Sequence, residues 1–215
     1  MRISIIGAGA VESHYVEILG IKKEEVLKEI NDISKVLANS GHDIVLLPDR
    51  GMPFEVAKLY KELGGKKAYG TVPLNDKDFG IGHLKEYIEA ETNGKKVFDK
   101  IINTDNWYKQ DMTMGLYGDA ILLLGLSTGS LGELSYAYYL YKIFKGHKPG
   151  VKGDGKSLHS EIVAGENIPL TTYAYKPFIK DKLPYELEKY IEKFWGKLVY
   201  VKNSKELGSI LSRLR

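Results

Sequence analysis

The pattern of apolar and polar positions changes twice between residues 119 and 141, and each change predicts a different element. Residues 120–124 (AILLL) form a continuous apolar run, which is typical of a strand buried on both faces of a parallel sheet. Residues 125–130 (GLSTGS) are small and polar, as in a tight loop. From Leu131, the apolar residues Leu134, Tyr138 and Tyr141 follow at spacings of three and four, which predicts a helix. The stretch therefore predicts half of a βαβ unit.

Apolar runs and helical spacing alternate along the rest of the chain. Further strands are predicted at residues 2–6, 43–47, 67–72, 97–102 and 198–201, with one short strand within residues 161–175. Helices are predicted at residues 22–38, 53–63, 84–90 and 184–195, and Ser204 is the expected N-cap of a terminal helix. Residues 146–157 are expected to be a loop. This order predicts an α/β fold with a doubly wound, mostly parallel sheet flanked by helices in a Rossmann-like three-layer sandwich. We expect residues 1–215 to form a single domain.

Glycine-bearing loops follow the first two predicted strands. The first, GAGAVE, begins with the G-x-G of a dinucleotide-binding fingerprint, but Glu12 occupies the place of the third glycine. The next helix is expected only near Lys22, so the pattern does not favour NAD and we expect no cofactor. Gly7 and Gly9 remain candidates for close backbone contact with a ligand, as does Gly51 in the second loop, PDRGMP.

The loop after the central strand is the main candidate for a binding site. Ligands in open α/β sheets lie at the carboxyl ends of strands, and free N–H groups at a helix start bind anions. The proposed nucleotide- or phosphate-binding residues here are Gly125, Ser127, Thr128, Gly129 and Ser130. Glu133 follows in the first turn of the helix, where it either stabilises the helix dipole or faces whatever the loop holds.

A polar segment precedes the central strand and begins a short helix that is expected to end at Gly118. Its residues Asp105, Asn106 and Gln110 are candidates for lining a pocket. The alternative is that these three residues are helix caps and solvated surface. The sequence does not decide between the two interpretations.

Composition limits the remaining classes. The chain has no cysteine, which excludes disulfides, zinc–thiolate sites and thiol chemistry, and its histidines show no metal-ligand spacing, so no metal is expected. A net charge of +3 without a Lys/Arg block does not favour nucleic acid. No apolar stretch is long enough to span a membrane and the N-terminus does not resemble a signal peptide. We therefore expect a cytoplasmic protein that binds neither nucleic acid nor membrane.

These features together resemble the Rossmann-like SLOG superfamily, which contains the lonely-guy-type phosphoribohydrolases and relatives labelled lysine decarboxylases. That family has a P-G-G-x-G-T-x-x-E loop after an apolar strand that begins D-A. Here Asp119-Ala120 opens the strand, and residues 125–133 (GLSTGSLGE) keep G-S-x-x-E, with Ser130 for threonine, but lack P-G-G. The family's catalytic Arg-Lys pair would align near Gln110 and Asp111, neither of which is basic. The resemblance implies a nucleotide-like ligand, with Glu133 supporting cleavage of an N-glycosidic bond.

A second resemblance is local. The segment GSLGELSYAYY is similar to the G-T-x-x-E-x-G-x-A motif of nucleoside 2-deoxyribosyltransferases, which would make Glu133 a nucleophile at the anomeric carbon.

The hypotheses that remain are therefore a nucleotide or nucleoside-phosphate binder that cleaves an N-glycosidic bond, a deoxyribosyltransferase-like enzyme, and a non-catalytic ligand-binding or oligomeric protein. The expected partner is a small-molecule nucleotide or nucleoside. Relatives in the superfamily commonly dimerise, so the resemblance implies a homodimer.

Overall fold

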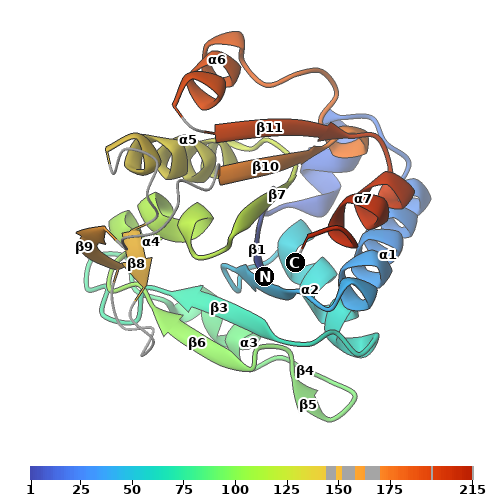
Figure 1. The fold of residues 1–215 in the computed structure, drawn as a ribbon. Coiled ribbons are helices and arrows are strands. Elements are labelled where there is room, and N and C mark those ends of the chain that lie inside the picture. The colour runs from blue at the N-terminus through green and yellow to red at the C-terminus, as the bar shows by residue number, and fades with distance from the viewer. Residues whose placement is uncertain (144–148, 152–157, 163–169, 195, 215) are drawn as a thin grey trace.

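A seven-stranded sheet forms the centre of the molecule, in the order β11-β10-β7-β1-β2-β3-β6 (Figure 1). The structure, a computed structural model, describes residues 1–143, 149–151, 158–162, 170–194 and 196–214. Every neighbouring pair in this sheet is parallel. Its strands are β1 (Arg2–Gly7), β2 (Asp43–Leu46), β3 (Ala68–Val72), β6 (Lys100–Asn103), β7 (Ala120–Leu124), β10 (Leu170–Tyr175) and β11 (Gly196–Val201). The fold is thus the Rossmann-like α/β architecture that the sequence predicts.

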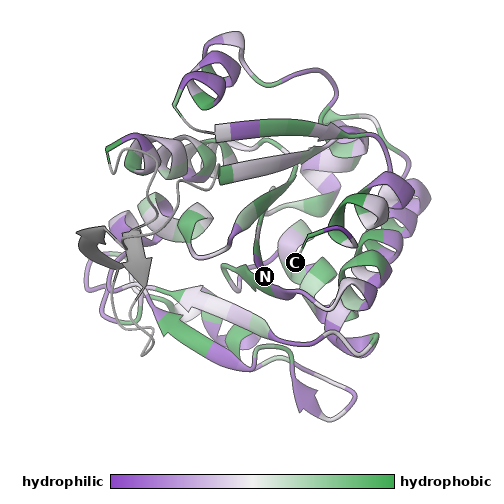
Figure 2. Cartoon of the chain, in the orientation of Figure 1, coloured by the Kyte–Doolittle hydropathy of each residue, from purple (hydrophilic) through white to green (hydrophobic). Residues whose placement is uncertain are grey.

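The apolar runs of the sequence become the inner strands of the sheet. All five residues of β7 are buried, and β1 buries Ile3, Ile5 and Ile6 against it. Strands covered on both faces by helices lose nearly all contact with water, which is why these segments are apolar without alternation. Figure 2 shows the contrast with the hydrophilic β4–β5 hairpin (Glu91–Thr92 and Lys95–Lys96), which projects away from the body of the fold.

Helices cover both faces of the sheet (Figure 1). On one face α1 (Lys23–Ser40) packs between α2 (Met52–Glu62) and α7 (Ser204–Leu211). On the other face α5 (Thr128–Ile143) packs against α4 (Trp107–Thr113) and α6 (Tyr185–Lys193). The helix α1 buries the predicted stripe of Val26, Ile30, Ile33 and Leu37, and it ends at Gly41, whose φ of 70° is the left-handed conformation expected there.

The segment after β1 differs from the prediction. Residues Val11–Ile18 form a π-helix, so the expectation that no helix begins before Lys22 is wrong. The prediction failed because only Tyr15 of this segment is buried, and a single buried position creates no helical period in the sequence. His14 lies in this π-helix, and burial lowers its pKa.

Other differences are smaller. The strand expected at residues 97–102 begins at Lys100, and the terminal helix is capped by Asn203, whose Oδ1 accepts the Glu206 N–H at 2.9 Å, so Ser204 is already helical. The helix expected at residues 84–90 is shorter, with the 3-10 turn Gly82–Leu84 followed by α3 (Lys85–Ile88). Within the loop expected at residues 146–157, the described part forms β8 (Pro149–Val151), which pairs with β9 (Leu158–Ile162). The rest of that loop lies outside the described residues.

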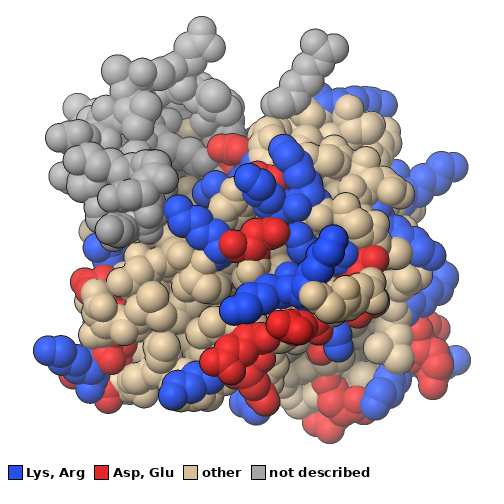
Figure 3. Space-filling view, turned by 90° about the horizontal axis from the view of Figure 1, so that it is seen from below, with Lys and Arg blue, Asp and Glu red and all other residues tan. Residues whose placement is uncertain are grey.

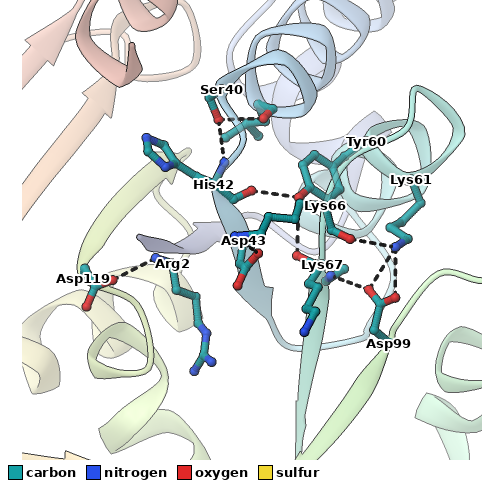
Figure 4. Close-up of polar contacts among 12 residues, drawn as sticks. Arg2, Ser40, His42, Asp43, Tyr60, Lys61, Lys66, Lys67, Asp99 and Asp119 are labelled. Carbon is teal, nitrogen blue, oxygen red and sulfur yellow. Dashed lines mark hydrogen bonds and ion pairs between the residues drawn. The ribbon is translucent and has the colours of Figure 1, made fainter. Parts of the chain in front are cut away.

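Polar contacts secure the sheet at the amino ends of its strands (Figure 4). The Arg2 N–H donates to Asp119 Oδ2 at 2.8 Å, which joins the start of β1 to the residue before β7. The Ala68 N–H donates to Asp99 Oδ2 at 2.8 Å, and Lys61 pairs with the same carboxylate at 2.9 Å. The carboxylates of Asp119 and Asp99 thus accept backbone N–H groups at the amino ends of β1 and β3, and these hydrogen bonds stabilise that edge of the sheet.

The face of the molecule seen in Figure 3 carries basic and acidic side chains interspersed over its described part. This mixture agrees with the small net charge of +3. No helix in the described part of the chain is long and apolar enough to cross a membrane. Among those same residues, no group of three or more His, Asp and Glu side chains is arranged to hold a metal ion.

Strand order fixes where a ligand site is expected. From β1 the chain adds β2, β3 and β6 on one side of the sheet, then returns to add β7, β10 and β11 on the other. The connections that leave β1 and β7 therefore diverge at the carboxyl ends of these strands. In open α/β sheets ligands bind in the crevice that such a reversal creates.

Candidate functional site

A cavity of about 170 Å³ lies at this reversal point. Its walls come from the ends of β1 and β2, the start of α2, one residue of α4 and the start of α5. The residues that line it are Ile5, Gly7, Gly9, Leu47, Asp49, Arg50, Pro53, Asp111, Ser127, Gly129, Ser130 and Glu133. Six of the candidates named from the sequence are among them: Gly7, Gly9, Ser127, Gly129, Ser130 and Glu133.

Two of the cavity-forming loops touch backbone to backbone. The Met52 N–H at the start of α2 donates to the Ala8 carbonyl at 3.1 Å. Gly51 has a φ of 119°, and a Cβ there would lie 2.5 Å from the Gly9 Cα. Only glycine allows this approach, so Gly51 shapes the cavity without lining it.

Tyr15 ties the loop after β1 to the loop after β7. Its hydroxyl donates to the Leu124 carbonyl and accepts the Ala8 N–H at 3.2 Å. Gly125 has a φ of 139°, and a Cβ there would lie 2.6 Å from the Tyr15 hydroxyl oxygen. Gly125, predicted to contact the ligand, is thus placed where it makes room for the tyrosine. The π-helix matters to the site because it carries this side chain.

The start of α5 is held by two serines that cap each other. The Ser127 N–H donates to Ser130 Oγ at 2.6 Å, and the Ser130 N–H donates to Ser127 Oγ at 3.2 Å. Ser130 Oγ also donates to the Gly125 carbonyl at 3.0 Å. These hydroxyls are occupied by the backbone, so their first role is to fix the shape of the loop.

The backbone N–H groups of Thr128 and Gly129, at the start of α5, are without a hydrogen-bond acceptor in the described structure. Gly129 borders the cavity, and a Cβ there would meet nothing closer than Ser127 Oγ at 3.8 Å. Arg50 is exposed at the same cavity, and its guanidinium has no ion-pair partner in the part of the chain that the structure describes. Free N–H groups at a helix start together with an unpaired cation favour an anion.

Two carboxyl groups lie in the same cavity. Burial and, as the smaller cause, the charge of Asp111 together raise the pKa of Glu133 to about 8. Burial also raises the pKa of Asp111. Glu133 keeps partial contact with solvent through the cavity, and neither carboxyl has a hydrogen-bond partner among the described residues. At pH 7 Glu133 is therefore roughly nine-tenths protonated and can donate a hydrogen bond.

The other candidates lie outside the cavity. Asn106 caps α4, since its Oδ1 accepts the Lys109 N–H at 2.9 Å, and Asp105 accepts from Asn75 Nδ2 at 3.1 Å. Gln110 is fully buried, and its Nε2 donates to Thr71 Oγ1 at 2.9 Å. The next residue, Asp111, is the one that reaches the cavity.

Sequence reasoning missed Asp111, Arg50 and Tyr15. Asp111 lies near the position where the superfamily resemblance would place a basic residue, so this cavity is lined by two acids, Asp111 and Glu133. Arg50 directly precedes Gly51, and this position beside a candidate glycine could have indicated it from the sequence. The role of Tyr15 could not be predicted from the sequence, because its hydroxyl bonds to Leu124, which is far away in the chain.

No protein-family model matches the chain, and no curated protein is detectably similar to it in sequence. Solved structures do resemble it. The molybdenum cofactor binding protein from Rippkaea orientalis superposes with a TM-score of 0.55 at 13% identity, over 98% of this chain and 94% of that one. The molybdenum cofactor carrier protein from Chlamydomonas reinhardtii gives 0.56 at 16% identity, over 99% and 96%. The structural-genomics target TM1055 gives 0.57 at 11% identity, over 99% of both chains. The chain thus has the Rossmann-like fold of these proteins over nearly its whole length, in agreement with the fold that the SLOG resemblance implies.

Proposed function

We propose that the chain binds a phosphorylated small molecule of the nucleotide class in the cavity between β1, β2 and α5. The observation that carries the proposal is the pair of unpartnered N–H groups of Thr128 and Gly129 beside the unpaired Arg50. A phosphate there would accept from the helix start and from the guanidinium. Its position at the reversal point of the strand order supports the same assignment.

The molybdenum cofactor belongs among the ligands to be tested, because two structural neighbours are named for binding or carrying it. These neighbours share the fold at low identity, and their ligand is a candidate for this chain only through the cavity described above.

Gly129 provides the test of the site. A Cβ there enters open space bordering the cavity, so Gly129→Val fills ligand volume without a clash inside the protein. Gly132 lies one turn further along α5, outside the cavity lining and also with open space around it, so Gly132→Val is the matched control. In isothermal titration calorimetry with nucleoside mono-, di- and triphosphates and the molybdenum cofactor, the first variant should lose binding and the second should keep it. If wild type binds none of these ligands, the proposal fails.

A second candidate function is hydrolysis of an N-glycosidic bond, favoured by the two carboxyl groups with raised pKa values. In this reaction protonated Glu133 gives its proton to the leaving base, ionised Asp111 takes a proton from water, and the water oxygen bonds to the anomeric carbon as the bond to the base breaks. Paired carboxyl groups in different protonation states perform the equivalent work in glycoside hydrolases. The role differs from the anionic nucleophile expected by analogy with deoxyribosyltransferases.

Base release measured by chromatography tests the enzymatic candidate. Glu133→Gln should lower release from a nucleoside monophosphate by orders of magnitude while calorimetric binding survives, because glutamine keeps the shape but has no transferable proton. If wild type releases no base from any common nucleotide, the enzymatic candidate is excluded and the binding proposal remains.

We also propose a homodimer. The outer face of α5 exposes Tyr136, Tyr139 and Ile143, which are 44%, 54% and 50% accessible in the single chain. Aromatic side chains are enriched in protein interfaces, and two of these three exposed side chains are tyrosines. Light scattering at micromolar concentration should give twice the mass of 24.1 kDa, and a monomeric mass would refute the proposal.

A further inference from the structure

A second hollow adjoins the cavity and shares two of its walls. It measures about 640 Å³ and is bordered by Asp49 and Arg50, which also line the first cavity, and by residues of the 3-10 turn and α3. The first cavity, at about 170 Å³, is smaller than the roughly 300–1,000 Å³ of sites that enclose a drug-sized ligand. A ligand whose phosphate occupies the first cavity must therefore extend beyond it, and the second hollow is directly adjacent.

The loop that leads into the 3-10 turn beside the second hollow is held by the Asp76 carboxylate, among other contacts. Asp76 accepts the N–H groups of Phe79 at 2.7 Å, of Gly80 at 3.1 Å and of Trp107 at 3.0 Å. The Trp107 indole N–H in turn donates to the Gly80 carbonyl at 2.9 Å. These contacts join the loop to the start of α4 and fix the point from which the chain enters the 3-10 turn that borders the hollow.

Aromatic rings and charges of both signs line this hollow. The imidazole of His83 stacks on Trp107, with ring centroids 5.5 Å apart and an interplanar angle of 15°. Tyr87 packs edge-on against Phe54 at 4.9 Å. Lys85 and Glu86 supply exposed donors and an exposed carboxylate at the rim, whose charges balance. A second phosphate is not favoured by this balance, whereas a planar ring with polar edges could stack on the rings and bond to both charges.

We propose that the second hollow binds the planar heterocycle of the ligand, so that the site takes a nucleoside monophosphate with its phosphate at α5 and its base against His83. Arg50 stands between the two subsites and contacts the ligand near their junction. This inference rests on the proposed function and adds to it where the base lies. The heterocycle extends the stack that begins with Trp107 and His83, while the Glu86 carboxylate accepts from an exocyclic amine of the base.

Calorimetry with ribose 5-phosphate and with AMP, GMP, CMP and UMP separates this inference from the proposed function. Ribose 5-phosphate should bind, and the nucleotides should bind roughly ten- to a hundred-fold more tightly, the range expected for base stacking on an aromatic side chain. If ribose 5-phosphate and the nucleotides bind equally, the second subsite is refuted while the phosphate site stands. If none of these five ligands binds, the inference fails, and the proposed function fails as well unless a nucleoside di- or triphosphate or the molybdenum cofactor binds.

Substitutions in the hollow locate the base. His83→Ala should weaken nucleotide binding about ten-fold and leave ribose 5-phosphate unchanged, since His83 is exposed and borders the second hollow but not the first cavity. Glu86→Gln should alter the preference among the four bases, whereas Glu89→Gln, one turn away and outside the lining, should not. Nucleotide affinity unaffected by His83→Ala would overturn the assignment.

Fluorescence gives an independent readout. The chain has two tryptophans, so a Trp195→Phe background leaves Trp107 as the sole reporter. A base placed on the Trp107–His83 stack should quench its emission, and ribose 5-phosphate should not. Equal quenching by both ligands, or by neither, would place the base elsewhere.

Discussion

Replacing Glu133 by glutamine should make the protein more stable at neutral pH. The folded protein holds the Glu133 proton with a pKa of about 8, against a usual value of 4.5. Because the folded state binds this proton more tightly than the unfolded chain does, raising the pH from about 4.5 to about 8 favours the unfolded chain, which alone ionises in that range. The stability of wild type should therefore fall across this window.

The size of the effect follows from the same pKa values. At pH 7, about 2.5 units above the usual pKa, Glu133 is ionised in the unfolded chain and mostly protonated in the folded state. This difference in protonation lowers the free energy of unfolding of wild type by about 3 kcal/mol. Partial solvent contact through the cavity makes this an upper limit. Glutamine does not ionise in either state, so Glu133→Gln should recover up to this amount at pH 7 and nearly nothing at pH 4.

Urea denaturation of wild type and Glu133→Gln at intervals between pH 4 and pH 8.5 measures the effect. The difference in the free energy of unfolding should grow with pH until about 8 and then level off. Glu89→Gln, at an exposed site outside the cavity, is the control and should show no such growth. A constant difference between wild type and Glu133→Gln across this range would refute the buried, protonated glutamate, and with it the general-acid role.

Three further predictions concern the groups around the cavity. Asp111→Asn should lower the pKa of Glu133 without returning it to 4.5, because burial is the larger cause; an NMR titration that finds no decrease would contradict the coupling. Tyr15→Phe should cost about 1–3 kcal/mol in urea denaturation, since the Ala8 N–H and the Leu124 carbonyl lose their buried partner, and an unchanged midpoint would show that the link is unimportant. Gly125→Ala should also cost about 1–3 kcal/mol from backbone strain, and the double variant with Tyr15→Phe should cost less than the sum because the clash with the hydroxyl is relieved; strict additivity would contradict the close approach.

The strands of the sheet could be predicted from the sequence because a strand buried on both faces appears as a continuous apolar run. The run AILLL became β7 with unchanged ends, and the helical stripe from Val26 to Leu37 became the buried face of α1. The π-helix Val11–Ile18 left no comparable mark, because it has a single fully buried residue, Tyr15, which is bonded to the backbone of Ala8 and Leu124. A helical period in the sequence appears only when several positions of a helix are buried along one face, and this segment buries one position fully.

The candidate site was predictable in part for the same reason. Glycines and small residues after buried strands indicate where the backbone must come close to something, and Gly7, Gly9 and Gly129 do border the cavity. What each glycine makes room for depends on contacts across the fold. For Gly51 the neighbour is Gly9, and for Gly125 it is Tyr15, neither of which lies nearby in the sequence.

Asp111 illustrates a different limit. The sequence places Gln110 and Asp111 side by side on a short helix, and only the orientation of α4 decides which one reaches the cavity. Adjacent helical residues point about 100° apart. The structure buries Gln110 against Thr71 and directs Asp111 toward the cavity that also holds Glu133, which changes the chemistry of the site.

The central claim is that a phosphate-bearing ligand binds at the start of α5 in the cavity beside β1 and β2. The most direct measurement is calorimetric titration of wild type, Gly129→Val and Gly132→Val with ribose 5-phosphate and a nucleoside monophosphate. The account predicts binding by wild type and Gly132→Val and its loss in Gly129→Val, with all three proteins equally folded by circular dichroism. Binding that survives in Gly129→Val as strongly as in Gly132→Val would contradict it.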